Sequence, residues 1–169
     1  MKFRIKERGK ENAWRHKRLT QAVSFYAKTL RIPNPKELDI TLKLSYAKKM
    51  IAESHRGNCN PALESYINGN LYIFTITMQG GMPWSWTLST FAHEMVHAHQ
   101  LATGRLRIAI VDGVWKYSWE QGEWVVPVKL GHSNYSEQPW EKDALSKQDS
   151  MRDAFFAIEE ATGILPTGY

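Results

Sequence analysis

The most informative stretch of the sequence is TLSTFAHEMVHAHQ, residues 87–100. His93 and His97 lie four residues apart in it, and four residues turn an α-helix by about 400°, so both imidazoles project from one face. Apolar residues at helical spacing surround the two histidines, namely Leu88, Phe91, Ala92, Met95 and Val96. The pattern predicts a helix that begins near Ser85 or Thr87, ends before Gly104 and can hold a metal ion on one face.

Glu94 places a carboxylate directly after the first of these two histidines. The run His93-Glu94-Met95-Val96-His97 is the H-E-x-x-H pattern of zinc metallopeptidases. In such a site the two histidines bind Zn²⁺, and the glutamate beside the first of them can reach a water molecule on the ion. The motif therefore predicts zinc as the cofactor, His93 and His97 as ligands and Glu94 as the general base.

A catalytic zinc usually takes three protein ligands and leaves a fourth position for water, so a further ligand is needed. The sequence favours Glu141, in the stretch QPWEKDA at residues 138–144, because Pro139 and Trp140 can anchor the start of a helix. Ala144 lies one turn later, and its small side chain would let this helix approach the metal-binding helix closely. The alternatives are His132, Glu137 and Asp143. His99 lies about 200° around the helix from His97 and is expected to be a half-buried or surface histidine.

The rest of the chain mixes helical and strand patterns. The apolar periodicity predicts helices over residues 12–30, 47–54, 136–146 and 149–162, the last ending at Gly163 and Ile164. Strict alternation predicts a strand over 38–44, and turn dipeptides predict hairpins of 65–67 with 71–77 and of 105–111 with 114–119. Residues 57–61 are expected to form a loop and 123–130 a further strand. The absence of regular β-α-β alternation indicates an α+β fold.

Composition limits the classes of protein that this chain can be. It has 169 residues, of which 43% are hydrophobic and 23% charged, as expected for one globular domain over residues 1–169. No apolar run is long enough for a membrane helix, and the first residues do not resemble a secretory signal. Cys59 is the only cysteine, so no disulfide forms within the chain, which favours a cytoplasmic location.

The net charge of +5 is concentrated near the N-terminus, in a basic lead over residues 1–11 and on as far as Arg18. A nucleic-acid partner bound through this basic region is one interpretation. A solvated basic face is the favoured one, because no aromatic-interleaved RNA-binding signature or zinc-finger spacing accompanies the charges.

These residues resemble the gluzincin-type zinc metallopeptidases, which carry HExxH followed by a glutamate in an E-x-x-A context. Here the second element is Glu141-Lys142-Asp143-Ala144. The segment YSEQPWE, residues 135–141, is similar to the Y…PWE segment of small predicted metallopeptidases, many of them phage-encoded. The similarity covers residues 65–146. It implies a compact zincin-like domain in which a small mixed or antiparallel sheet packs on the metal-binding helix, and a phage source would place it in the host cytoplasm.

A weaker similarity reaches SprT-like proteases through the strand 38–44 and Gly57-Asn58-Cys59. Those proteins usually have a third histidine ligand, whereas Glu141 is the favoured third ligand here. Larger gluzincins often carry an aspartate four residues after the ligand glutamate, and this chain has Leu145 at that position. Asp143 or Asp149 is therefore expected to hydrogen-bond a ligand histidine instead.

The resulting hypothesis is a zinc metallopeptidase that hydrolyses protein or peptide substrates. Glu94 takes the proton of the attacking water, and Tyr135 or His132 donates a hydrogen bond to the oxyanion. The strand over 71–78 is expected to be the sheet edge beside the cleft, where an extended peptide can pair. Three tryptophans either line this cleft or, as is favoured, pack in the core: Trp84, Trp86 and Trp119.

Three other functions remain open at this stage. The first is a nucleic-acid-associated SprT-like protease, and the second is a catalytically silent zincin-fold binding protein. The third is a hydrolase of a non-peptide amide. The intact Glu94 argues against the silent protein, because a purely structural metal site needs no base.

Overall fold

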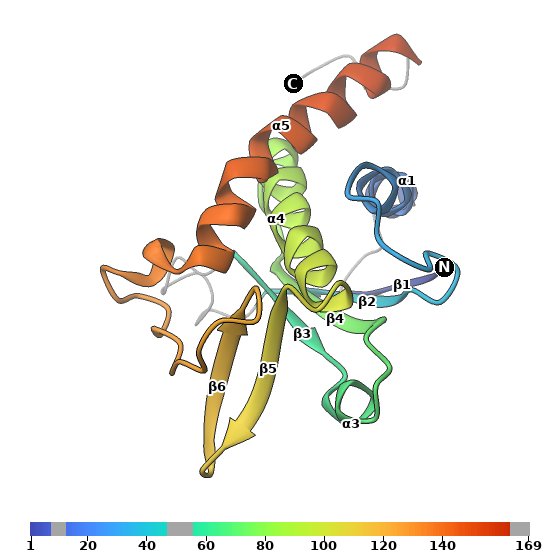
Figure 1. Cartoon of the computed structure of the whole chain (residues 1–169). Coiled ribbons are helices and arrows are strands. Elements are labelled where there is room, and N and C mark those ends of the chain that lie inside the picture. The colour runs from blue at the N-terminus through green and yellow to red at the C-terminus, as the bar shows by residue number, and fades with distance from the viewer. Residues whose placement is uncertain (8–12, 47–55, 163–169) are drawn as a thin grey trace.

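A four-stranded sheet lies beneath the helices of the computed structural model, which describes residues 1–7, 13–46 and 56–162 (Figure 1). Its strand order is β1 (Lys2–Glu7), β2 (Asp39–Ser45), β4 (Ile73–Gln79) and β3 (Gly57–Pro61). The first three strands are parallel, and β3 pairs antiparallel with β4. A separate hairpin is formed by β5 (Leu106–Val111) and β6 (Val114–Trp119). The mixed sheet and its helices confirm an α+β architecture.

Three long helices position the candidate site. They are α1 (Ala13–Thr29), α4 (Trp84–Ala102) and α5 (Pro139–Ala161), beside the short α3 (Leu63–Ile67) and a 3₁₀ turn at Tyr135–Glu137. In Figure 1, α1 and α4 lie on the same side of the sheet and α5 runs along α4. Alternate residues of β2 and β4 are buried against these helices: Ile40, Leu42, Leu44, Phe74, Ile76 and Met78. The alternation predicted for 38–44 therefore marks a half-buried strand, in a parallel pairing.

Several predicted elements are confirmed within one or two residues. The predicted helix over 12–30 is α1, and the metal-binding helix is α4, which begins at Trp84 and ends at Ala102. The hairpin around Asp112-Gly113 is β5 and β6. These segments have strong periodicity or a tight-turn signal, and such local signals survive in the folded protein.

The predicted hairpin of 65–67 with 71–77 is wrong in its first arm. Residues Leu63–Ile67 form α3, and Asn68-Gly69 ends this helix instead of connecting two strands. Gly69 has φ +84°, and its N–H donates to the carbonyl of Tyr66. An Asn-Gly pair supplies the left-handed residue that both a tight hairpin and a helix end require, so the dipeptide alone does not distinguish them.

The predicted loop at 57–61 and the predicted edge strand at 71–78 are both wrong. Residues Gly57–Pro61 form β3, which is one of the two edge strands, while β4 lies inside the sheet between β2 and β3. The sequence GNCNP lacks the β-branched residues typical of buried strands. Short strands that contain proline and polar residues are characteristic of sheet edges, where only one side needs a partner.

The two helices predicted over 136–146 and 149–162 form one continuous helix, α5. The polar residues Gln148 and Asp149 interrupt the apolar stripe, but both make contacts with α4. The strand predicted over 123–130 is reduced to a single bridge between Tyr117 and Val125. The predicted helix over 47–54 and the helix end at Gly163 and Ile164 lie outside the described residues.

Part of the basic N-terminal lead is strand β1. Phe3 and Ile5 are half-buried and pack against the core, whereas Lys2, Arg4 and Lys6 are exposed. Among the described residues, no helix is long and apolar enough to cross a bilayer.

Candidate metal centre

Three side chains that are far apart in the sequence converge between α4 and α5. The Nε2 atoms of His93 and His97 are 3.0 Å apart. Carboxylate oxygens of Glu141 lie 3.3 Å from Nε2 of His93 and 3.5 Å from Nε2 of His97. One ligand atom from each residue lies within 4.8 Å of those of the other two, so the group could hold a metal ion.

The two helices place these groups for local reasons. His93 and His97 are one turn apart on α4, as the four-residue spacing requires. Glu141 is in the first turn of α5, where Pro139 begins the helix and the positive end of the helix dipole favours a carboxylate. Ala144, one turn further on, is completely buried and lets α4 and α5 approach closely. Of the third-ligand candidates, the structure brings Glu141 to the histidines and leaves His132 and Glu137 exposed.

Glutamines, not aspartates, hold the outer nitrogens of the two imidazoles. Nδ1 of His93 lies 3.0 Å from Oε1 of Gln148, and Nδ1 of His97 lies 2.9 Å from Oε1 of Gln100. An amide oxygen only accepts hydrogen bonds, so Nδ1 of His97 carries a proton where it faces Oε1 of Gln100, and the Nε2 atom of the same ring faces the centre.

The predicted aspartate partners are therefore wrong for both histidines. Asp143 accepts a hydrogen bond from Gln100, and Asp149 accepts one from Ser89. The two glutamines were missed, although a spacing signal exists. Gln100 lies three residues after His97 and Gln148 seven after Glu141, which are helical same-face positions.

The charge state of Glu141 suits a metal ligand. Its burial by itself would raise the pKa of the carboxyl group, but hydrogen bonds with His93 and His97 and their charges lower it to about 2. Glu141 is therefore an ionised carboxylate at neutral pH, and it faces the Nε2 atoms of both imidazoles.

Glu94 lies beside this group and is only 4% exposed. Burial raises the pKa of its carboxyl group to about 8, while the neighbouring His93 lowers it and Glu141 raises it. In the described part of the chain its Oε2 atom has no hydrogen-bond partner. A buried carboxyl oxygen without a hydrogen-bond partner, next to a carboxylate and two converging imidazoles, fits a site for a cation with a mixed nitrogen and oxygen preference such as Zn²⁺.

Comparison of the chain with protein-family models, with curated proteins and with solved structures finds no match.

A pocket of about 490 Å³ opens over the three converging side chains. Its walls include strand β3, the β5–β6 hairpin and the segment that leads into α5. Apolar or aromatic side chains from the hairpin, from this segment and from α4 and α5 line part of it, namely Leu101, Leu106, Ile108, Tyr117, Val128, Leu130 and Trp140. The pocket therefore combines an apolar wall with a small number of converging polar groups, which is the usual composition of a ligand site.

Tyr135 lies in this pocket, whereas His132 does not line it. Burial raises the pKa of Tyr135, and the charge of Glu141, together with a hydrogen bond to that carboxylate, raises it further. The Tyr135 hydroxyl is therefore protonated at neutral pH and able to donate. The N–H of Asn134 donates to the exposed His132 at Nδ1. None of the three tryptophans considered above lines the pocket: Trp84 is buried, Trp119 half-buried and Trp86 is 50% exposed.

Proposed function

We propose that this chain is a zinc-dependent metallopeptidase with a zincin-like domain, in which His93, His97 and Glu141 hold the ion. The observation that carries the proposal is the convergence of two imidazole nitrogens and an ionised carboxylate beside the buried Glu94. A structural zinc site is normally closed by four ligands. Among the described residues three potential ligands face a pocket, which would leave a fourth position for solvent or substrate.

The residues around the centre have distinct roles in this proposal. When bound, Zn²⁺ supplies Lewis acidity that lowers the pKa of water and polarises a carbonyl group. Glu94, ionised beside the bound cation, accepts the proton of the attacking water and passes it to the leaving amine. Tyr135 donates its hydroxyl proton in a hydrogen bond to the carbonyl oxygen as negative charge develops on it.

Strand β3 is the proposed docking edge for an extended peptide. The N–H of Gln79 donates to the carbonyl of Arg56, and the N–H of Ala62 donates to the carbonyl of Ile73. In an antiparallel ladder these bonds assign the even-numbered residues of β3 to pairing with β4. The N–H and carbonyl of Cys59 therefore point away from β4, along the pocket, where a substrate strand could pair with them.

The decisive experiment combines metal analysis with a matched variant. We expect the purified chain to contain about one zinc per molecule and to cleave members of a random peptide mixture, as followed by mass spectrometry. Glu94→Gln should keep the zinc and lose cleavage, because the amide cannot accept the proton. A chain without zinc would contradict the metal centre, and a Glu94→Gln variant that cleaves as fast as the parent chain would contradict the general base.

Peptide cleavage, hydrolysis of non-peptide amides and DNA binding together separate the remaining alternatives. A catalytically silent binding protein would hold zinc and leave every peptide intact, and a hydrolase of other amides would cleave only non-peptide compounds. For a nucleic-acid-associated protease, the basic N-terminal region would have to bind DNA with a steep salt dependence. Fewer basic side chains of this region are available to DNA than the sequence suggested. Arg15 donates to the carbonyl of Met82, and Arg18 pairs with Glu159 inside the protein.

A further inference from the structure

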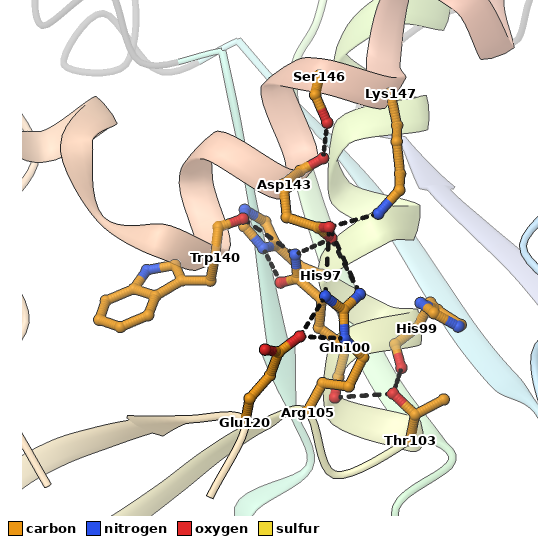
Figure 2. Close-up of polar contacts among 10 residues, drawn as sticks. All are labelled: His97, His99, Gln100, Thr103, Arg105, Glu120, Trp140, Asp143, Ser146 and Lys147. Carbon is orange, nitrogen blue, oxygen red and sulfur yellow. Dashed lines mark hydrogen bonds and ion pairs between the residues drawn. The ribbon is translucent and has the colours of Figure 1, made fainter. Parts of the chain in front are cut away.

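The side-chain amide of Gln100 is completely buried between α4 and α5, and each of its polar atoms has a defined partner (Figure 2). Its Nε2 lies 2.9 Å from the carbonyl oxygen of Trp140 and 2.9 Å from Oδ2 of Asp143. Its Oε1 lies 2.9 Å from Nδ1 of His97.

These contacts determine the orientation of the amide. Both partners of Nε2 are acceptors, so the NH₂ group of Gln100 donates one hydrogen to each. A flipped amide would place its oxygen against a carbonyl and a carboxylate, which leaves buried acceptors facing each other. The oxygen of Gln100 therefore has to face His97, and Nδ1 of His97 has to carry the proton.

We propose that Gln100 is a positioning residue that holds His97 in the Nδ1–H tautomer, and that Trp140 and Asp143 act through it. In this tautomer the lone pair of His97 Nε2 points toward His93 and Glu141. The competing tautomer would place a proton on Nε2, 3.5 Å from Glu141, and would block that nitrogen as a ligand.

Asp143 is itself held by cations that lie outside the centre. Its carboxylate pairs with Arg105 at 3.3 Å and with Lys147 one turn along α5. Arg105 also pairs with Glu120 at 2.7 Å, just beyond the end of β6. Figure 2 shows this succession of contacts from Glu120 through Arg105 and Asp143 to Gln100. The base of the β5–β6 hairpin is thereby connected to the tautomer of His97.

No equivalent set of hydrogen bonds determines the tautomer of His93 among the described residues. Oε1 of Gln148 faces Nδ1 of His93, but within the described residues no hydrogen bond from its Nε2 determines which way the amide points. The inference is therefore specific to His97.

The tautomer can be measured in the metal-free chain, independently of zinc and of activity. Long-range ¹H–¹⁵N spectra at alkaline pH, where the imidazoles are neutral, distinguish a protonated Nδ1 from a protonated Nε2. We expect Nδ1–H at His97 in the parent chain and Nε2–H in Gln100→Met, which keeps an unbranched side chain but removes the acceptor. Nε2–H in the parent chain, or an unchanged tautomer in a folded Gln100→Met variant, would overturn the proposal.

A second variant keeps the test decisive if Gln100→Met does not fold. Gln100→Glu retains an acceptor for Nδ1–H but brings its other oxygen against Trp140 and Asp143. It should keep the Nδ1–H tautomer even where its thermal stability is reduced. Nε2–H in this variant would contradict the role of the acceptor. The spectrum of the parent chain tests the proposal even without either variant, because Nε2–H at His97 there would overturn it.

The zinc arm of the experiment rests on the proposed function. We expect Gln100→Met to bind zinc about 10–100-fold more weakly in competition with a chromophoric chelator, as is usual when a partner of a ligand histidine is removed. Asp143→Asn should weaken binding less, and the matched control Asp153→Asn, which loses only an exposed ion pair with Arg152, should not weaken it. Equal zinc affinity in all four chains would overturn the positioning role. If the parent chain bound no zinc, the proposed function would fail while the tautomer measurement still decided this inference.

Discussion

A Cβ atom added to Gly57 would lie 2.7 Å from Oε1 of Glu94 and 2.7 Å from the methyl group of Thr90. Edge strand β3 thus approaches α4 closely at the point where Glu94 projects. The backbone of Gly57 does not have a positive φ, so the glycine is required for space and not for conformation. The position of the candidate general base therefore depends on a residue that lies 37 positions earlier in the chain.

Substitution of Gly57 should impair catalysis without removing the metal. In Gly57→Ala the new methyl group has to displace Glu94 or β3, and a shift of about 1 Å in a catalytic group can cost about 100-fold in rate. We expect a loss of kcat/KM of that order with the zinc content unchanged. Steady-state kinetics with a cleaved peptide and metal analysis provide the two measurements.

The double variant Gly57→Ala/Thr90→Ser tests the stated cause. It removes the methyl group of Thr90 but leaves the collision with Glu94. Activity should therefore stay low. Full recovery of activity would show that the added methyl group acts by displacing Thr90 and not Glu94.

Removal of the charge of Glu141 should weaken metal binding strongly. Glu141→Gln keeps the shape of the side chain but replaces the ionised carboxylate that faces both imidazoles. The loss of zinc affinity should exceed the loss of about 10–100-fold that is typical when a residue that only hydrogen-bonds a ligand is replaced. Glu137→Gln is the matched control, because Glu137 is exposed and pairs with Lys142. Chelator competition should show unaltered affinity for this control, and equal affinity in both variants would exclude Glu141 as a ligand.

Proline substitutions in β3 should separate substrate pairing from sheet stability. Cys59→Pro removes an N–H that points away from β4, so the protein should fold and its KM for peptides should rise. Asn58→Pro removes an N–H that points toward β4 and should lower the melting temperature instead. Circular dichroism and peptide kinetics on both variants give the comparison, and an unchanged KM in a folded Cys59→Pro protein would contradict pairing at this edge.

Removal of one partner of the buried ion pair between α1 and α5 should destabilise the protein strongly. Nε of Arg18 lies 3.4 Å from Oε1 of Glu159, and the side chains are only 2% and 1% exposed. Arg18→Met leaves a buried carboxylate without its cation and should cost about 3–5 kcal/mol in the free energy of unfolding at neutral pH. The comparison variant Arg152→Met removes a more exposed cation and should cost less than about 1 kcal/mol in urea denaturation.

The cost of Arg18→Met should become smaller at acidic pH. Burial already raises the pKa of Glu159, while Trp84 and Arg18 lower it, so removal of Arg18 raises it further. A carboxyl group with a raised pKa in the folded state favours folding when it is protonated. Stability is therefore retained below the unfolded pKa of about 4.3 and lost as the pH rises toward the folded value. A cost independent of pH would contradict this account.

The sequence predicted most accurately those parts of the fold that depend on local periodicity. The helix that carries His93 and His97, the half-buried strand β2 and the hairpin around Asp112-Gly113 were all predictable, because side-chain alternation and turn chemistry act over a few residues. The edge strand β3 was not, because GNCNP forms a strand only through its pairing with β4.

The same division applies to the candidate site. The four-residue spacing of two histidines on a helix, and the glutamate next to the first, follow from the sequence alone because helix geometry is local. The distance from Glu141 to those histidines, the glutamines that orient the rings and the glycine against which Glu94 lies came only from the tertiary structure. The contacts of Glu141, Gln148 and Gly57 join separate elements across the α4–α5 interface or between β3 and α4, so they depend on how the elements pack. Gln100 and His97 both lie on α4, but the orientation of the Gln100 amide depends on Trp140 and Asp143 of α5. The sequence therefore predicted which residue types could bind a metal, whereas the packing of the helices brings those residues together.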